Sequence, residues 1–580
     1  MIPAYTSFKV DIKNLKFTCE NGTVCPKTAI ISFEVPGKNQ PVVELLGYVD
    51  EELVYKLIDA GEPVFLDHCY IQKFSIAEYR SQRNIPLKQA VELNGFSARY
   101  AFIDSQLDID FSNTLMKEGD FSLEHAWFHR GALSFDSAKF ENDKLDFSYA
   151  KFSNDNFNFK NVKILKADVI FKNAIFGNGG KDFQYSEFGG KELNFINAEF
   201  NDGDVSFINT NIRSANVSFK VARFGEGKVD FHYAKFKTGN KSFERTEFGN
   251  GRVDFRTVEF GTGKVNFNRA QFGVGEVSFE ASEMEMGRFS FKRALLGCGE
   301  INFEQAIFNK IDVSFEKTEF GPGSISFYMS SFKTLSLKFC HLDNYVDLRL
   351  AHCTNIDLSS TIVRDIIDIQ PHEFDLDVEE ISFAGMRLIG RIYINWKLNH
   401  VKSLIGKQEA TNHRLKAEQF RILKENFKNL GQYNDEDKSY VEFKRHESKA
   451  DFEDAIARKK INALWHYPLY LFKLGLFDKA GLYATSPVRV LLTMVSTFVF
   501  FSVCYICLVL FTAADIIPSV DDQLSVVARS FYHSAITFLT IGYGDHYPYG
   551  FIRWVSSVEG FAGLFLMSYF TVAFVRKILR

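Results

Sequence analysis

Apolar positions recur at a fixed interval through the middle of the chain. Counting in steps of twelve from Phe111 to Phe339 gives 20 positions, and 19 of them are Phe, with Leu123 as the exception. A second apolar series, also mostly Phe, lies five residues after these positions and runs from Met116 to Phe332. A fixed period over so long a stretch predicts a solenoid, in which successive turns of the chain stack on one another.

The residues around each Phe predict short strands. A β-branched residue stands two positions before the first Phe of a repeat, as Val229 does before Phe231, and a small residue stands two positions before the second, as Ala234 does before Phe236. This period of two places both side chains on the inner face of a strand. Gly-x-Gly pairs follow, such as the pair that begins at Gly249. We interpret them as corners that need positive φ, and not as nucleotide-binding loops, because no helical pattern follows them.

A small, a variable and a bulky apolar residue at steps of five resemble the pentapeptide-repeat family, whose fold is a right-handed quadrilateral β-helix. The plain five-residue step is kept at Leu348, Cys353, Leu358 and Val363, whereas the central region adds two residues at alternate corners. Identical corners stack only if each turn holds an even number of steps, so we expect four sides and 24 residues per turn. We assign the β-helix solenoid to residues 111–400.

The flanking segments lack this repeat. We expect residues 1–110 to cap the N-terminal end of the solenoid, because exposed end strands need covering. Within them, residues 50–61 predict a short helix and residues 63–71 a strand. We interpret His68 and Cys69 as chance neighbours, because no further ligand stands at metal-binding spacing.

Helical patterns begin near residue 409. Residues 409–461 predict a hairpin of two helices, the first ending at Gly431 and the second capped by Asp435. Residues 465–485 combine Trp, Tyr and Phe with Lys, which is typical of an interfacial segment that lies on a membrane surface.

Two apolar stretches close to the C-terminus are long enough to cross a bilayer. Residues 490–514 contain no charge, and residues 554–575 contain only Glu559. Between them, SFYHSAITFL (530–539) predicts a half-length apolar helix that leads directly into TIGYGD (540–545).

Two spans, a half-helix and TIGYGD together resemble the pore module of potassium channels, which we assign to residues 486–580. The resemblance implies that four copies surround one axis as a homotetramer in the lipid bilayer, and that K⁺ is the permeant ion rather than a cofactor. It also implies a selectivity filter whose backbone carbonyls replace the hydration shell of K⁺. The implied filter residues are Thr540, Ile541, Gly542, Tyr543 and Gly544, with K⁺ coordinated at the first four.

The same resemblance assigns the outer mouth to Asp545, and His546 directly follows it. A histidine there would make the mouth sensitive to protons, whereas a solvated histidine would have no effect. Position 536 holds Ile and not the carboxylate of some family members, so we expect Asp545 to lack an acidic partner on the pore helix.

Gly560 and Gly563 in the second span are hinge candidates, and close helix packing is the alternative explanation for them. Six basic residues flank the outer ends of the two spans, and two lie in the loop between: Lys473, Lys479, Arg489, Arg576, Lys577 and Arg580 against Arg529 and Arg553. This asymmetry predicts that both termini are cytoplasmic.

Composition excludes several function classes. The net charge of −4, and equal counts of 30 basic and 30 acidic residues between 111 and 340, argue against nucleic-acid binding and DNA mimicry. Eight cysteines are scattered without the spacing of a zinc module, and no catalytic motif or cofactor site is evident, so we expect no enzyme.

The sequence thus predicts a tetrameric K⁺ channel in the cell membrane with a cytoplasmic solenoid that gates or anchors it. An unknown cytoplasmic ligand or protein would bind the solenoid. The alternative is a membrane-tethered scaffold with a structural or non-selective pore. Nothing in the sequence identifies the gating stimulus.

Overall fold

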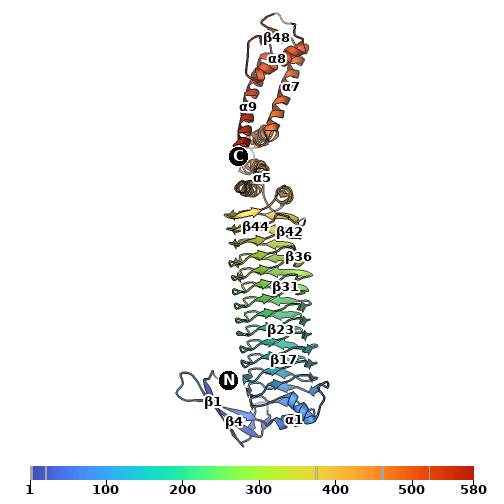
Figure 1. Cartoon of the computed structure of the whole chain (residues 1–580), viewed down its shortest axis with the longest axis vertical. Coiled ribbons are helices and arrows are strands. Elements are labelled where there is room, and N and C mark those ends of the chain that lie inside the picture. Colours follow the sequence, from blue (N-terminus) through green and yellow to red (C-terminus); the bar gives the residue numbers. More distant parts are fainter. Residues whose placement is uncertain are drawn as a thin grey trace. The chain divides into compact units, whose positions relative to one another are not determined.

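The structure, a computed structural model, describes residues 4–19, 22–372, 374, 376–458, 463–520 and 523–579 of the 580-residue chain. The chain divides into two compact units, Met1–Leu404 and Ile405–Arg580. Figure 1 shows that the first unit is built mainly from stacked short strands and the second mainly from helices.

Most of the first unit is a parallel β-solenoid with four faces. One turn consists of β27 (Val229–Asp230), β28 (Lys235–Phe236), β29 (Asn240–Ser242) and a single bridge residue, Glu247. The next turn begins at β30 (Val253–Asp254), where Val253 pairs with Val229, so each turn holds 24 residues as predicted.

The four faces form long ladders. The longest sheet has 14 strands, from β6 (Val64–Phe65) to β45 (Asp377–Ser382), and the next has 13, from β11 (Ile109–Asp110) to β47 (Arg391–Tyr393). The third face carries a seven-stranded sheet that begins at β8 (Val91–Leu93) and ends at β28. Single bridges and a five-stranded sheet, β34 (Leu295–Leu296) to β46 (Arg387–Leu388), form the fourth.

Stacked phenylalanine rings fill the interior. The ring of Phe231 stacks on Phe207 at 4.7 Å and on Phe255 at 4.9 Å, with ring planes within 7° of parallel. The neighbouring column meets it edge to face, as Phe219 does at 5.8 Å and 89°. All four side chains are fully buried. Because each ring contacts its own column and the next, the aromatic repeat supplies a continuous core.

The corner glycines serve close approach and not positive φ, which corrects the prediction for the Gly-x-Gly pairs. A Cβ on Gly249 would lie 2.0 Å from the carbonyl oxygen of Gly225 in the turn before, so only glycine fits where the corners stack. The left-handed conformation belongs instead to residues such as Tyr233 (φ 60°) and Arg245 (φ 56°), two positions after the first Phe.

The parallel sheets begin before residue 111, the predicted start of the solenoid. Strand β6 pairs in parallel with β9 (Phe96–Ser97), and the early turns bury residues such as Val64, Leu66 and Tyr70. A twelve-residue count of Phe does not detect these turns, because other apolar residues occupy their inward positions.

The Phe count also extends too far at the other end. Phe339 is 44% exposed, and Leu337 takes the inward place. The reason is a shorter turn, since Ile325 pairs with Val346 only 21 residues later.

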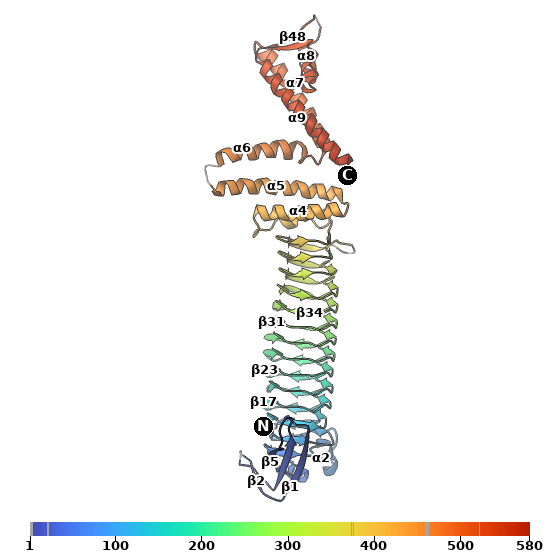
Figure 2. The ribbon, with the colours of Figure 1, turned by 90° about the vertical axis from the view of Figure 1, so that its left-hand side faces the viewer.

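An antiparallel sheet caps the N-terminal end of the solenoid (Figure 2). Its elements are β1 (Ser7–Lys13), β4 (Lys27–Glu34) and β5 (Val42–Tyr48), and β5 continues in parallel into β7 (Cys69–Ile71), β10 (Phe102–Asp104) and β14 (Trp127–Arg130). A hairpin of β2 (Phe17–Thr18) and β3 (Val24–Cys25) lies beside it, with helices α1 (Glu51–Asp59) and α2 (Ile76–Arg83). The single strand predicted at 63–71 is two strands, β6 and β7, separated by a corner at His68 (φ 54°).

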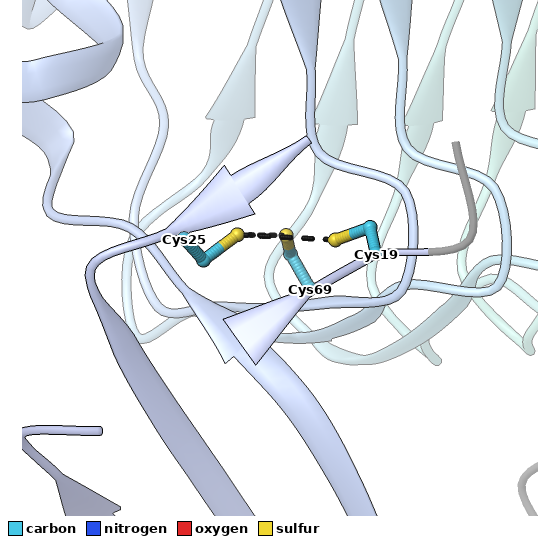
Figure 3. A group of neighbouring side chains, drawn as sticks. All are labelled: Cys19, Cys25 and Cys69. Carbon is cyan, nitrogen blue, oxygen red and sulfur yellow. Dashed lines mark hydrogen bonds between the residues drawn. The ribbon is translucent and has the colours of Figure 1, made fainter. Parts of the chain in front are cut away.

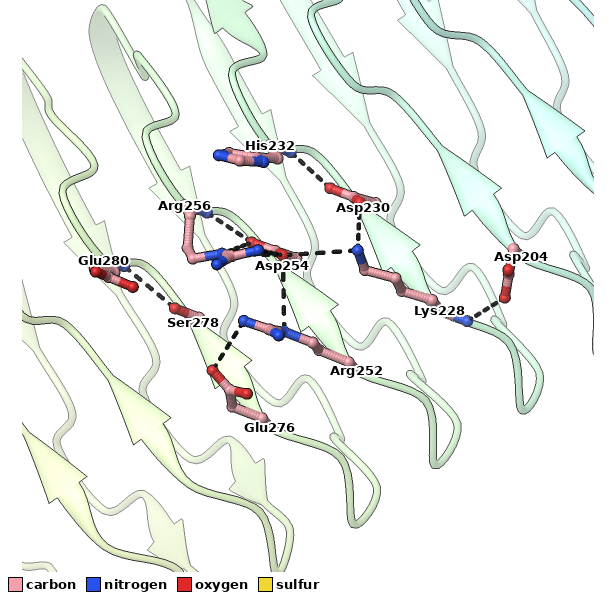
Figure 4. Close-up of polar contacts among 10 residues, drawn as sticks. All are labelled: Asp204, Lys228, Asp230, His232, Arg252, Asp254, Arg256, Glu276, Ser278 and Glu280. Atoms are coloured by element: carbon pink, nitrogen blue, oxygen red, sulfur yellow. Dashed lines mark hydrogen bonds and ion pairs between the residues drawn. The ribbon is translucent and has the colours of Figure 1, made fainter.

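Charged side chains pair along the outside of the solenoid (Figure 4). The buried carboxylate of Asp254 lies 2.7 Å from Arg256, 3.7 Å from Arg252 and 3.8 Å from Lys228. Burial raises the pKa of Asp254, but the hydrogen bonds from Arg256 outweigh it and hold the pKa below its ordinary value. The balanced charge of this region is therefore used between neighbouring turns.

The second unit contains the connector and the membrane helices. Its elements are α4 (His413–Asn429), α5 (Tyr433–Arg458), α6 (Ala463–Lys473), the π-helix η2 (Leu474–Lys479), α7 (Pro487–Phe511), β48 (Asp515–Pro518), α8 (Val526–Phe538), β49 (His546–Tyr549) and α9 (Ile552–Ile578). A short helix, α3 (Val401–Gly406), crosses the boundary between the units.

Helices α4 and α5 form the predicted hairpin, and Phe420, Leu423 and Phe427 are buried between them. The first helix ends before Gly431 (φ 70°), as expected. Asp435 does not cap the second helix, because the helix already begins at Tyr433 and Asp435 lies in its first turn.

Candidate functional site

Helices α7 and α9 are both long and apolar enough to cross a membrane. Each exposes large apolar side chains, including Leu492 and Phe500 on α7 and Phe561 on α9. In water such surfaces would be unfavourable, whereas lipid tails are as apolar as the side chains themselves. These helices match the predicted spans, with ends shifted by two or three residues.

Helix α8 lies between the spans and is too short to cross on its own. It begins at Ser525, whose side chain accepts a hydrogen bond from the backbone N–H of Ala528, and it ends at Phe538. The chain then turns back through residues 540–545 and returns along β49, which pairs with β48. This is the half-helix and return loop that the sequence predicts.

The predicted filter residues form one continuous exposed segment after this helix. Gly542 (φ 59°) and Gly544 (φ 77°) adopt the left-handed backbone conformation expected of them. Thr540 adopts it too (φ 56°), which the sequence did not indicate, and its hydroxyl donates to the carbonyl of Leu539 at 2.7 Å. The backbone N–H of Ile541 donates to the carbonyl of Ile536 at 2.8 Å, which joins the segment to the helix end.

The outer-mouth residues have partners that the sequence did not reveal. Tyr532 on α8 donates its hydroxyl hydrogen to the carboxylate of Asp545 at 2.7 Å. Residue 536 is a buried Ile, so a phenol on the same helix binds Asp545 in place of a carboxyl group. The ring of His546 is buried edge-on to Tyr532 at 5.1 Å, with its Nδ1 atom 3.5 Å from the Asp545 carboxylate. His546 is therefore not the solvated histidine of the alternative interpretation.

A polar cluster that the sequence analysis missed joins all three helices of the pore module. The fully buried carboxylate of Glu559 on α9 accepts hydrogen bonds from Tyr505 on α7 and Ser534 on α8, each at 2.5 Å. His533 on α8 bonds Ser556 on α9 at 2.9 Å. The available signal was Glu559 itself, because a lone charge in an apolar span faces a polar partner.

The two hinge candidates differ in their surroundings. A Cβ on Gly563 would lie 2.0 Å from the carbonyl oxygen of Phe538, so this glycine lets α9 approach the end of α8. A Cβ on Gly560 would meet nothing closer than 3.9 Å, at Thr537. Close packing therefore explains Gly563, while a hinge at Gly560 stays a prediction.

The connector contacts the C-terminal end of α9. Asp437 on α5 lies 3.0 Å from Arg576 and 2.9 Å from Lys577, and the Arg576 guanidinium lies 4.4 Å from the ring centre of Tyr440. The Asp437 side chain is only 10% exposed, so water screens these contacts weakly.

A second contact joins α5 to the π-helix before the first span. Arg445 binds the carboxylate of Asp478 with two hydrogen bonds, of 2.8 and 3.0 Å, and a third of 2.8 Å joins it to Glu442. The hydrogen bonds to Asp478 raise the pKa of Arg445. On α9, the hydroxyl of Tyr569 accepts from the backbone N–H of Ala484 at 2.8 Å. The connector and the ends of both spans thus form one contact network.

Comparison with known proteins supports an ion channel at this end of the chain. Residues 490–580 match the family model described as "Ion channel". No curated protein and no solved structure matches the chain. The matched segment holds both spans, the half-helix and the return loop. Residues 490–580 therefore form a membrane-spanning domain of the ion channel family, joined in one chain to a parallel β-solenoid.

Proposed function

We propose that this protein is a K⁺-selective channel formed by four copies of the chain. The observation that carries the proposal is the segment from Thr540 to Gly544, which follows a half-helix between two spans and has glycines at two of its left-handed positions. Alternating left-handed residues turn successive carbonyls toward one side of the backbone, which is what coordination of a dehydrated cation requires. One chain supplies a single such segment, so a ring of chains must complete the ion sites.

Both termini lie in the cytoplasm in this proposal. The basic residues at the outer ends of the spans outnumber those in the loop between them, and this excess favours the cytoplasmic side. The solenoid is then cytoplasmic, and the return loop opens to the outside. Tyr532 stabilises the outer mouth by holding the carboxylate of Asp545.

Ion selectivity in liposomes tests the proposal. Gly542→Ala places a side chain on a residue with φ 59°, so we expect K⁺ flux to lose its preference over Na⁺. Gly406→Ala is the matched control, because a Cβ at Gly406 meets nothing within 4 Å and its φ is not left-handed. Unchanged K⁺ selectivity in Gly542→Ala would refute the filter assignment, and a wild type that conducts no ions would favour the membrane-tethered scaffold.

We also propose that the connector transmits movement of the solenoid to the pore. Helix α5 binds the C-terminal end of α9 through Asp437 and the segment before α7 through Arg445, so a displacement of α5 acts on both spans. Charged hydrogen bonds such as those of Asp437 each contribute about 1.5–3 kcal/mol. A tenfold change in the open–closed ratio needs only about 1.4 kcal/mol, so these contacts are strong enough to bias gating.

Single-channel recording of Asp437→Asn tests this coupling. Removing the charge weakens the contacts to Arg576 and Lys577, and we expect the open probability to change about tenfold. Asp454→Asn is the matched control, because Asp454 is on the same helix and its ion pair joins α5 to Arg414 of α4 and not to α9. Equal open probabilities in wild type and Asp437→Asn would leave the solenoid as an anchor alone.

A further inference from the structure

Three cysteine thiols that are distant in the sequence meet in the N-terminal cap (Figure 3). Cys19 follows β2, Cys25 lies in β3, and Cys69 begins β7. The Sγ atom of Cys25 lies 3.6 Å from that of Cys69 and 3.9 Å from that of Cys19. Within the part of the chain that the structure describes, this is the one group of three His, Cys, Asp or Glu ligand atoms that lie within 4.8 Å of one another.

The cluster is enclosed, and the backbone leaves room for its sulfur atoms. Cys25 and Cys69 are fully buried, and Cys19 is 4% exposed. Gly47 of β5 pairs with Cys69, and a Cβ there would lie 2.5 Å from the Cys25 sulfur and 3.2 Å from the Cys69 sulfur. Glycine at this position is therefore what allows the thiols to converge.

The sulfur separations are those of ligands around one metal ion. A disulfide would need about 2.05 Å between two sulfurs, so none of the three is bonded to another. Thiolates on a tetrahedral zinc ion at about 2.3 Å are about 3.8 Å apart. The observed separations of 3.6 and 3.9 Å lie on either side of that value.

The local chemistry also favours a thiolate. Hydrogen bonding with Cys69 lowers the pKa of Cys25 to about 7, although burial acts in the opposite direction. Metal ions bind the thiolate and not the thiol, so a cysteine that ionises near neutral pH makes binding easier. Sulfur ligands select zinc and other thiophilic ions over Mg²⁺ and Ca²⁺, which prefer oxygen.

We propose that Cys19, Cys25 and Cys69 bind one Zn²⁺ ion, which joins the β2–β3 hairpin to the first turn of the solenoid. Three thiols release three protons when they become ligands, and the remaining tetrahedral position takes water or another group. Because Cys19 and Cys25 come from the hairpin and Cys69 from a solenoid strand, the ion crosslinks the cap to the end that it covers. Its binding free energy adds to the stability of the cap, since the unfolded chain holds no preformed site.

Zinc content of the full-length protein tests the proposal. The protein is purified in detergent under reducing conditions without chelator, and zinc per chain is measured by mass spectrometry. We expect one zinc ion per chain in the wild type and none in Cys25→Ser. Cys340→Ser is the matched control, because Cys340 is equally buried but lies alone in the solenoid core, where its thiol donates to the carbonyl of Phe315 at 3.0 Å. Cobalt substitution should give a sulfur-to-metal charge-transfer band in the wild type and in Cys340→Ser only.

A second measurement covers the case in which Cys25→Ser does not fold. Removing zinc from the wild type with a chelator should increase hydrogen exchange in β2, β3 and β7 and leave β27 to β30 unchanged. Three results would each overturn the proposal: reduced wild-type protein that takes up neither zinc nor cobalt, a disulfide between Cys25 and Cys69, or copper in place of zinc.

Discussion

The solenoid and the pore module are built with opposite distributions of polarity. In the solenoid, stacked Phe rings fill the interior and ion pairs cover the outside, as around Asp254. In the pore module, apolar side chains such as Phe500 are exposed, and the carboxylate of Glu559 is fully buried. The difference follows from the surroundings, because water favours burial of apolar groups and lipid does not.

The two regions also differ in how their contacts are organised. Each solenoid turn pairs only with the turns before and after it, so its stability is a sum of local terms. In the pore module, Glu559 joins α7, α8 and α9 at a single point. We therefore expect a core substitution to act locally in the solenoid and on the whole module in the pore.

The largest effect should come from an interior ring. Phe231→Ala removes a fully buried side chain that stacks on both sides, and we expect a loss of about 3–5 kcal/mol. Hydrogen exchange should rise only in the neighbouring turns, whereas the half-exposed Tyr233, changed to Ala, should lose less than about 0.5 kcal/mol. Uniform loss of protection from β6 to β47 would show that the solenoid unfolds as one unit.

A smaller effect should follow from Glu559→Leu in the pore module. The hydroxyls of Tyr505 and Ser534 would lose their acceptor inside the protein, at a cost of about 1–3 kcal/mol. Thermal unfolding in detergent should show the loss, and Glu559→Gln should recover part of it by keeping an acceptor. Val558→Leu, at an exposed neighbouring position, serves as the control. Equal stability of Glu559→Leu and Val558→Leu would contradict a structural role for the polar cluster.

The connector should respond to mild acid, with the smallest effect of the three. The Nδ1 atoms of His413 and His446 lie 2.8 Å apart, so one proton can lie between them but two cations repel. Burial, with the repulsion from His413, lowers the pKa of His446 from 6.5 to about 4. Lys416 and Lys449 also disfavour the charge there, and Glu453 lies 3.6 Å from His413.

The sign of the pH dependence follows from that shift. Between pH 6.5 and about 4 the unfolded connector binds more protons than the folded one, so stability falls as the pH falls and levels off below about 4. With solvent screening, we expect a loss of about 2 kcal/mol. His446→Phe keeps the stacking on Phe420 and should remove the dependence, while His341→Ala on the solenoid should not. A pH dependence that survives in His446→Phe would exclude this pair as its source.

The sequence was sufficient where a local repeat or a short segment carries the information. The step of twelve predicted four faces and 24 residues per turn, because the same inward position recurs in each turn. The order of span, half-helix, TIGYGD and span predicted the pore module for the same reason, since its elements follow one another directly. The function of the corner glycines was predicted wrongly, because a count along one turn does not show the backbone of the next.

Contacts between distant segments were decided by the tertiary structure alone. Tyr532 reaches Asp545, Glu559 reaches Tyr505, and Asp437 reaches Arg576 only when helices separated in the sequence pack together. The same holds for Cys69, which seemed an isolated cysteine beside His68 and lies instead 3.6 Å from Cys25, 44 residues earlier. Periodicity determines which way a side chain points, but folding determines what it meets, because the partner comes from another turn or another helix.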